Sequence, residues 1–524
     1  MFVKKFLFVL KSPVTYWITA AIVLIIGFFL RGHMILSGDF WFTPDQARDM
    51  VLSRDVVNFH KLILIGARSG VDGIFHGPLW IYMLSIPFAI FNGDPQKVSY
   101  FYIFFSLIIV LSGFVAAYKL YNKWTALLLL IVLSFSSGLY SIVSLTTEAH
   151  GLFLIMVGYL LSMLLFIRGK DKAIIAAVLL AGLAFNFQAA FAIFLLPYTV
   201  LTALVLRRSI FKVKNLVLYV LVYVGSLIFL ILFELRHQFL ETHAVLKMLF
   251  SPATLKPIKG YEQYGNLLFR IQDRLIGIAN VPNSFLAKQD LFLYVLVVLA
   301  IALAFYLLLK KKNYAYLKEF IFLLAFPIFV YLLYIIYPLP IWGHYTFAIL
   351  IVAAFLFVLS ALVIWKETAG KVIITAFVLY TAYLTVGSFV DLYKTKYVPK
   401  TDGSYINQLR VVDGVFKTAN GKHFSYFVYA PQVYTYGMDY LLWWRGKNVY
   451  GYTPTNIKEP GLMFLIMYPY DQDSSAHGYW IKNKIRTNAK IISTKIYSGN
   501  ITVEERLNLG LEPAVDPNYY LNTR

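Results

Sequence analysis

A succession of long apolar segments constrains this chain more than any other feature of its sequence. A helix needs about 20 apolar residues to cross the hydrocarbon core of a bilayer. Eleven segments approach or reach this length, at residues 14–30, 98–118, 124–146, 149–167, 173–187, 189–206, 216–234, 291–309, 320–337, 346–365 and 372–389. Because a helix satisfies its backbone hydrogen bonds internally, we expect an all-α polytopic membrane protein with about eleven transmembrane helices.

The composition excludes the main soluble alternatives. Of the 524 residues, 60% are hydrophobic and only 14% are charged, whereas a water-facing surface carries about 25–35% charged residues. This excludes a soluble enzyme and a disordered chain. The sequence contains no cysteine, which excludes disulfides, a thiolate nucleophile and cysteine-based metal sites.

The net charge of +21 would suggest nucleic-acid binding in a soluble chain. Here the basic residues lie largely in short connections between apolar segments, the position in which positive charge holds loops in the cytoplasm. The six basic connections contain Lys4/Lys5/Lys11, Lys119/Lys123, Arg168/Lys170/Lys172, Arg207/Arg208/Lys212/Lys214, Lys310/Lys311/Lys312/Lys318 and Lys366/Lys371. We therefore expect no nucleic-acid partner, a multi-pass protein of the cell membrane and a cytoplasmic N-terminus.

The same connections predict the topology. All six lie on one side only if the apolar stretch 77–91 does not cross, so we expect a juxtamembrane helix there, within a first outer loop at 37–97. Because the basic connections before and after residues 173–206 must lie on the same side, this segment is predicted to form a hairpin that bends near Asn186 and Gln188. A second outer loop then covers residues 235–290.

The composition changes after the last apolar segment. We expect a transmembrane module at residues 1–389 and a small extracytoplasmic α/β domain at residues 390–524. That domain is expected to contain a helix at Ser404–Thr418 and strands at Phe424–Tyr429, Leu462–Tyr468 and Lys490–Tyr497.

Polar side chains gather on the predicted outer side. Ionisable groups beside transmembrane segments are costly, so they mark candidate functional sites. We take as candidate substrate-binding residues Arg48, Asp49, His76, Glu148, His150, Asn186, Gln188, Arg236, His237, His344 and Tyr345. Solvated charges, helix caps, a hydrogen-bonded turn residue at His344 and side chains that reach toward the membrane surface remain the alternative.

The first outer loop contains the sequence Thr43-Pro44-Asp45-Gln46-Ala47-Arg48-Asp49. Thr43 as N-cap and Pro44 at the first helical position predict a helix start. Asp45 then lies in the first turn and shares a face with Asp49, four residues later. An ordinary interfacial helix with solvated charges is the alternative.

Two further segments carry groups that suit an anion. His76 precedes the apolar helix predicted at 77–91, and a helix N-terminus favours phosphate. Arg236 and His237 follow the segment 216–234, where they could pair with Glu234 or with a phosphate head group.

Taken in order, these elements resemble the C-type membrane glycosyltransferases, in particular the bacterial relatives of protein O-mannosyltransferases and of the lipid A aminoarabinose transferase. The resemblance rests on the acidic motif Asp45-Gln46-Ala47-Arg48-Asp49, on His76-Gly77-Pro78-Leu79 and on the segment Phe233 to His237. The sequence departs from the family pattern at Gln46, where the usual pair is Asp-Glu, and at Gly77, where it is Pro-Pro.

The resemblance implies a polyprenyl-phosphate sugar as donor, an acceptor that the sequence does not identify, and Asp45 as the general base. It also implies that His76, Arg236 and His237 face the donor phosphate. A divalent metal is possible in this family, but Gln46 weakens a paired-acid metal site here. The chain would thus transfer a sugar, with inversion, on the outer face of the membrane.

Two other classes stay open at this point. A transporter or lipid flippase would place charged or helix-breaking residues near mid-membrane in paired segments, whereas the polar residues here gather on one face. A receptor that binds through its outer tail would leave most of the membrane-embedded sequence without a role.

Overall fold

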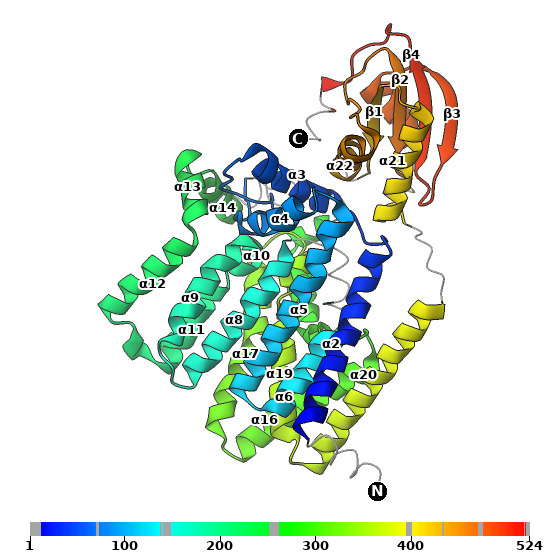
Figure 1. Cartoon of the computed structure of the whole chain (residues 1–524). Coiled ribbons are helices and arrows are strands. Elements are labelled where there is room, and N and C mark those ends of the chain that lie inside the picture. The colour runs from blue at the N-terminus through cyan, green and yellow to red at the C-terminus, as the bar shows by residue number, and fades with distance from the viewer. Residues whose placement is uncertain are drawn as a thin grey trace.

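The protein is a helical bundle with a small sheet-containing domain at one end (Figure 1). The computed structural model describes residues 12–69, 73–136, 139, 148–250, 261–394, 401–431, 434–469, 475–517 and 519. Lys4, Lys5 and Lys11 lie outside the described residues, as does most of the second half of the predicted segment 124–146. The polytopic helical architecture that the apolar segments predicted is confirmed.

Within the described residues, seven helical stretches are long and apolar enough to cross a membrane. They are α2 (Pro13–Leu36), α5 (Pro95–Leu120), α8 (Ala149–Ile167), α10 with α11 (Ala189–Leu206), α16 (Leu291–Lys310), α17 with η6 (Tyr314–Ile336) and α20, which runs over Thr368–Lys394. An eighth is the pair α12 (Val213–Ser226) and α13 (Ile228–Arg236), which is bent by 69°. The shorter apolar helices α6 (Lys123–Phe135), α9 (Ala173–Leu183) and α19 (Ile349–Ile364) match the other three predicted segments. The count of eleven crossings stays a prediction.

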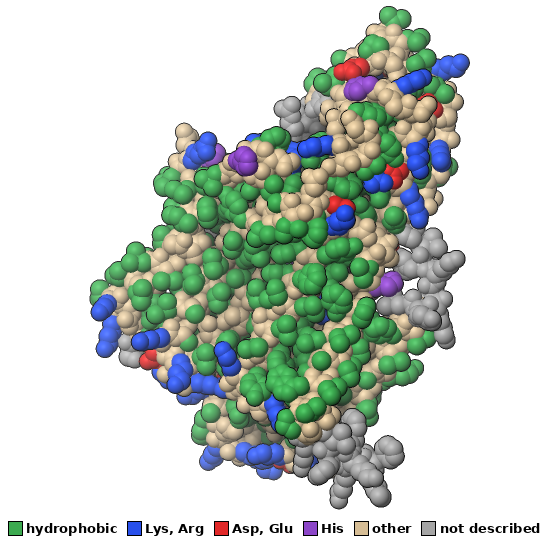
Figure 2. Space-filling view, viewed as in Figure 1, with side chains coloured by type: hydrophobic (Ala, Val, Ile, Leu, Met, Phe, Trp, Pro, Cys, Tyr) green, Lys and Arg blue, Asp and Glu red, His purple; other side chains and the backbone are tan. Residues whose placement is uncertain are grey.

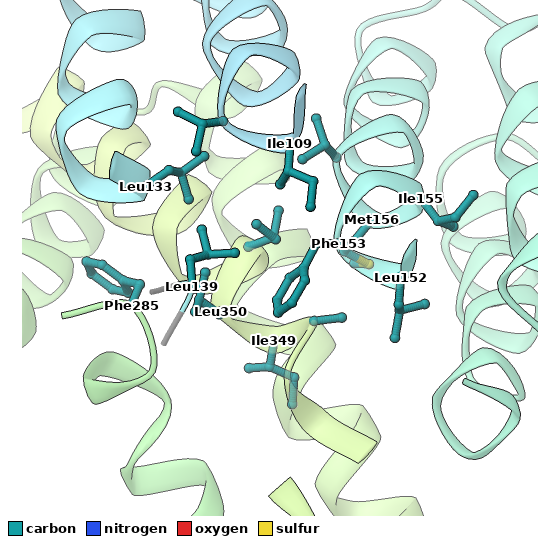
Figure 3. Close-up of a cluster of buried hydrophobic side chains, with 14 of the residues drawn as sticks. Ile109, Leu133, Leu139, Leu152, Phe153, Ile155, Met156, Phe285, Ile349 and Leu350 are labelled. Carbon is teal, nitrogen blue, oxygen red and sulfur yellow. The ribbon is translucent and has the colours of Figure 1, made fainter. Parts of the chain in front are cut away.

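The core of the bundle forms around α19, which packs against α6, α16 and α17. Figure 3 shows Ile349 and Leu350 of this helix beside Phe153 of α8, with Ile109 and Leu133 above them. These side chains are all buried. By contrast α12 has no buried residue, which places it at the periphery of the bundle.

Arg31 lies fully inside the bundle, on α2. Its Nε donates to Ser106 Oγ at 2.8 Å, and its other nitrogens donate to the carbonyl oxygens of Gly27, Leu133 and Ser134. Leu133 and Ser134 belong to the last turn of α6, where carbonyl groups lack partners within the helix. Arg31 therefore caps α6 and ties it to α2 and α5.

Two helices of the first outer loop lie across the end of the bundle (Figure 1). Helix α3 (Pro44–Phe59) packs against α4 (Leu79–Ile90). With 12 residues, α4 is too short to cross a membrane by itself. The structure therefore confirms helices in this loop, while their position beside the membrane stays a prediction.

The described part of the C-terminal domain contains four strands in the order β1-β2-β4-β3. β1 (Phe424–Tyr429) pairs in parallel with β2 (Gly461–Met467), and β4 (Thr502–Asn508) pairs antiparallel with both β2 and β3 (Lys490–Ile496). The domain also contains the helices α21 (Tyr405–Ala419), α22 (Tyr436–Arg445) and α23 (Ala476–Tyr479) and the short helical turns η7 (Gly446–Tyr450) and η8 (Trp480–Ile485). The α/β character, the first helix and three of the strands are confirmed, while β4 was not predicted.

Direct hydrogen bonds join this domain to the first outer loop. Tyr405 N–H donates to Phe40 O at 2.9 Å, and Gln408 Nε2 donates to Phe42 O at 3.0 Å. Tyr440 Oη, on α22, donates to Gly93 O at 2.7 Å. The domain is therefore fixed to the segments that precede α3 and follow α4.

Lys and Arg side chains gather at the end of the bundle far from the C-terminal domain, in addition to those on the domain itself (Figure 2). Among them, Lys311 pairs with Glu367 at 2.6 Å, and Arg168 pairs with the buried Glu319 at 2.6 Å. The positive-inside pattern predicts that this end faces the cytoplasm.

Candidate functional site

The candidate site begins at the first turn of α3. Thr43 is the N-cap and Pro44 the first helical residue, as predicted. The Gln46 backbone N–H donates to Thr43 Oγ1, and Gln46 Oε1 accepts from the Thr43 backbone N–H at 2.9 Å. This reciprocal capping box fixes the start of the helix, so the direction of the following side chains is set by the local sequence.

Three carboxylates surround the guanidinium of Arg48. Its Nη1 lies 2.7 Å from Asp45 Oδ1, and its Nη2 lies 3.0 Å from Asp49 Oδ1 and 3.9 Å from Glu148 Oε2. Asp45 is 64% exposed, whereas Asp49 is fully buried. We call these four residues the acid cluster. The predicted shared face of Asp45 and Asp49 is confirmed, since both reach the same arginine.

Burial controls the charge of the two inner carboxyls. It raises the pKa of Asp49 to about 6 against the opposing effect of Arg48, and it raises the pKa of Glu148 to about 8, to which the charge of Asp49 adds. Burial disfavours the charge of Arg48, but the three carboxylates outweigh it and raise the pKa of that guanidinium. Burial therefore favours the protonated form of Glu148, while the neighbouring carboxyl groups keep Arg48 charged.

His76 lies beside Glu148 and is buried. Its Nδ1 accepts a hydrogen bond from the Ala189 backbone N–H at 3.2 Å, and its Nε2 lies 3.7 Å from Glu148 Oε1. Burial, reinforced by the charge of Arg48, lowers the pKa of His76 to about 3. The imidazole is thus neutral, with its proton on Nε2. It can offer an anion a hydrogen bond but no charge.

The bend at Asn186 holds the segment that carries His76. Gly77 N–H donates to Phe185 O at 3.1 Å, and Leu79 N–H donates to Asn186 Oδ1 at 3.4 Å. A Cβ atom on Gly77 would lie 2.7 Å from Asn186 Cγ and closer still to Oδ1. The structure therefore explains the departure from Pro-Pro, because a proline at 77 has neither the room nor the N–H that this contact requires.

Gln188 is the most unusual polar group of the site. The side chain is 1% exposed, and neither its Oε1 nor its Nε2 has a hydrogen-bond partner among the described residues. Leaving a buried amide unpaired costs about 1–3 kcal/mol. Gln188 follows the bend at Asn186 and precedes Ala189, whose N–H binds His76. A polar ligand that contacts this amide would remove the cost.

Other predicted residues approach the acid cluster from neighbouring helices. Burial lowers the pKa of His344, which the charge of Asp45 partly offsets, and Glu148 acts electrostatically on the buried Tyr345. The His150 ring stacks on the Trp80 ring, with 6.5 Å between the two ring centroids. Trp80 was not predicted, yet its Nε1 donates to Asp49 Oδ2 at 3.2 Å. Its position in an apolar helix gave no signal of this polar contact.

Arg236 and His237 do not join the acid cluster. Arg236 is exposed at the end of α13 and forms no ion pair within the described part of the chain. The His237 ring stacks on Phe233 at 4.2 Å, and Phe233 contacts Phe75, the neighbour of His76. Of the two possibilities that the sequence left open for these residues, pairing with Glu234 is not found among the described contacts, and Glu234 instead accepts from Glu241 N–H at 2.7 Å.

Sequence reasoning also missed Glu241, on α14 (Leu240–Phe250). Its Oε1 accepts from the Phe75 backbone N–H at 3.1 Å. Burial raises the pKa of Glu241 to about 7, and the nearby Glu234 adds to this. The second outer loop therefore holds the residue next to His76, a long-range contact that no local pattern in the sequence indicates.

Comparison with known proteins supports the architecture. No protein-family model and no curated protein sequence matches this chain. The solved structure of ArnT from Cupriavidus metallidurans in the apo state is similar, with a TM-score of 0.59 and 11% identity, and the match covers 94% of this chain and 98% of that one. The structure of the same protein bound to undecaprenyl phosphate matches over the same shares, with a TM-score of 0.52 and 11% identity.

The archaeal oligosaccharyltransferase AglB from Archaeoglobus fulgidus, solved with an inhibitory peptide and a dolichol-phosphate, has a TM-score of 0.48 and 13% identity over 78% of this chain and 58% of that one. The likeness to ArnT extends over nearly the whole length of both proteins. The resemblance to C-type membrane glycosyltransferases that the sequence indicated is therefore confirmed for the fold.

Proposed function

We propose that this chain is a membrane glycosyltransferase that moves a sugar from a polyprenyl-phosphate donor to an acceptor hydroxyl on the outer face of the membrane. The observation that carries the proposal is the acid cluster. Within a fold shared with ArnT, it places one exposed carboxylate, Asp45, beside buried polar groups at the outer end of the bundle. A base that accepts a proton from a substrate must be accessible, and Asp45 is the only exposed carboxylate of the four residues.

The proposed reaction is a single displacement. Asp45 accepts the proton of the acceptor hydroxyl as its oxygen attacks the anomeric carbon of the donor sugar. The bond between that carbon and the phosphate oxygen breaks, and its electron pair leaves with the polyprenyl phosphate. The configuration is inverted. Since the leaving group is already an anion, the protein has to supply position, a base and hydrogen-bond donors.

The roles of the other residues follow from their contacts. Arg48 orients Asp45 through the 2.7 Å hydrogen bond to Oδ1. His76 Nε2 and the unpaired Gln188 amide are donors for the donor substrate, either its phosphate or its sugar. Asn186 accepts a hydrogen bond from Leu79 N–H and so positions the segment that carries His76. The exposed Arg236 and His237 lie at the edge where a lipid phosphate could approach.

The test is transfer by Asp45→Asn in the full chain. We expect at least a 100-fold loss of transfer with little change in donor binding, because the amide keeps the shape but cannot accept the proton. Asp55→Asn is the matched control, since Asp55 lies on the same helix and pairs only with Arg54 and Lys61 in the described structure. Undiminished transfer by Asp45→Asn would refute the role of Asp45 as base.

A second test separates binding from chemistry. Gln188→Leu removes both polar atoms at a similar volume, and we expect weaker binding of undecaprenyl phosphate or of its sugar derivative. If affinity for both is unchanged, the donor does not contact this amide.

We also propose that the end carrying the sheet domain is extracytoplasmic. The chain has no cysteine, so a single cysteine at the exposed Lys490 or at Lys311 would be the only thiol. A membrane-impermeant maleimide applied to intact cells should label the first and not the second; the reverse result would invert the topology.

A further inference from the structure

The acid cluster is arranged around a cation, and that cation is an arginine. Arg48 lies between Asp45, Asp49 and Glu148, with nitrogen to oxygen distances of 2.7, 3.0 and 3.9 Å. Its side chain is 18% exposed and Glu148 is 12% exposed. Three carboxylates that converge on one point normally repel each other, so a positive charge at the centre stabilises the arrangement.

Carboxylate oxygens are also the ligands that divalent cations such as Mg²⁺ and Mn²⁺ prefer. A metal in this fold would compete for the same oxygens that Arg48 holds. Gln46 adds no acid, and its Oε1 is engaged by the Thr43 N–H. Within the described residues, no group of three His, Cys, Asp or Glu side chains is arranged to hold a metal ion. The residues present therefore do not fit a metal centre at this site.

We propose that the Arg48 guanidinium fills the position of a divalent cation in the acid cluster, so that the protein works without a bound metal. Arg48 is a positioning residue in this scheme. Its planar fork supplies directed hydrogen bonds to Asp45 and Asp49, a geometry that lysine cannot reproduce. The part of this inference that concerns activity rests on the proposed function, whereas the part that concerns metal binding does not.

The direct test is Mn²⁺ binding, measured by electron paramagnetic resonance on the full-length protein after treatment with EDTA. We expect no Mn²⁺ site at the acid cluster of the wild type. Arg48→Met removes the charge and the side chain that hold the three carboxyl groups apart, so they can draw together around a metal ion, and we expect the variant to bind Mn²⁺ at least tenfold more tightly than the wild type does. Adding Glu148→Gln to this variant should abolish the gain.

Two controls isolate the effect of position. Arg54→Met removes an arginine from the same helix, where it pairs with Asp55, and should bind no additional Mn²⁺. Arg48→Lys keeps a charge at the centre and should likewise bind none. If Arg48→Met does not fold, the wild type and Arg48→Lys still test the proposal.

Wild-type protein that binds one Mn²⁺, with loss of binding in Glu148→Gln, would overturn the inference. It would also be overturned by a folded Arg48→Met variant that binds no more Mn²⁺ than Arg54→Met. In the activity arm, transfer by EDTA-treated wild type should stay within twofold of untreated protein. A metal-dependent transfer refutes this inference but leaves glycosyl transfer intact, whereas a complete lack of transfer counts against the proposed function and leaves the Mn²⁺ result standing.

Discussion

Replacing Gly77 by alanine perturbs the site at a contact whose geometry is known. The change adds a single methyl group beside His76. That Cβ would lie 2.7 Å from Asn186 Cγ and 3.2 Å from Asn186 Cα, and both distances are shorter than ordinary van der Waals contact. The Gly77 φ angle is not in the left-handed region, so the effect is steric and not a matter of backbone strain.

The size of the effect follows from what Asn186 would lose. The easiest relief is rotation of its side chain, which breaks the hydrogen bonds from Leu79 N–H at 3.4 Å and to Leu183 O at 3.2 Å. Each is worth about 0.5–1.5 kcal/mol, so the loss of both costs about 1–3 kcal/mol. Without the rotation, the crowding of the packed site costs about 1–3 kcal/mol instead. We expect Gly77→Ala to lower the free energy of unfolding by about 1–3 kcal/mol.

The assay is a double-mutant cycle with Asn186→Ala, measured by SDS unfolding in mixed micelles. Asn186→Ala removes the side-chain atoms that clash, so the cost of Gly77→Ala should fall by about 1 kcal/mol or more in that background. Gly387→Ala is the matched control, since a Cβ there meets nothing within 4 Å. An equal cost of Gly77→Ala in both backgrounds would refute the steric argument.

Three further outcomes are expected. Burial raises the pKa of Glu148 from 4.5 to about 8, so the contribution of this carboxyl group to the free energy of unfolding is full below pH 4.5 and is lost as the pH rises to about 8. The melting temperature should therefore fall between pH 5 and 8, and Glu148→Gln should make this fall smaller in thermal scans. Tyr440→Phe should lower the melting temperature, since it leaves the Gly93 carbonyl without its buried donor at a cost of about 1–3 kcal/mol. Arg168→Ala should cost about 3–5 kcal/mol because it leaves Glu319 buried and unpaired, while donor affinity of the folded protein should stay unchanged.

The fold was largely predictable because its determinants are local. Apolar segments of membrane length, the Thr43-Pro44 helix start and strands such as Leu462–Tyr468 each carry their signal within a few residues. The strand β4 (Thr502–Asn508) carries none, because its sequence Thr-Val-Glu-Glu-Arg-Leu-Asn is polar at most positions. It forms a strand because it lies between β2 and β3, which is a tertiary effect.

The sequence named the four residues that the structure brings together in the acid cluster, but not all of the contacts among them, and their roles stay predictions. The pairing of Arg48 with Asp45 follows from their spacing of three residues on a helix, whereas the approach of Arg48 to Glu148 joins segments about 100 residues apart. The polar role of Trp80 depends on its contact with Asp49. From the sequence, Arg236 and Arg48 are both cations beside a predicted membrane segment. The packing of α13, which places Arg236 outside the acid cluster, is a tertiary effect that the sequence does not indicate.

The buried Arg31 has a consequence for synthesis. Its partners at Leu133 and Ser134 are translated about 100 residues later, and a lone arginine in a membrane helix costs about 2.5–3.5 kcal/mol on insertion scales. We therefore expect α2 to insert reversibly at first, with the Arg31 guanidinium reaching toward water. The helix should take its final position only when α6 has inserted and supplies the carbonyl partners of Arg31. Biogenesis of the whole outer site would then depend on the order in which the translocon releases these helices.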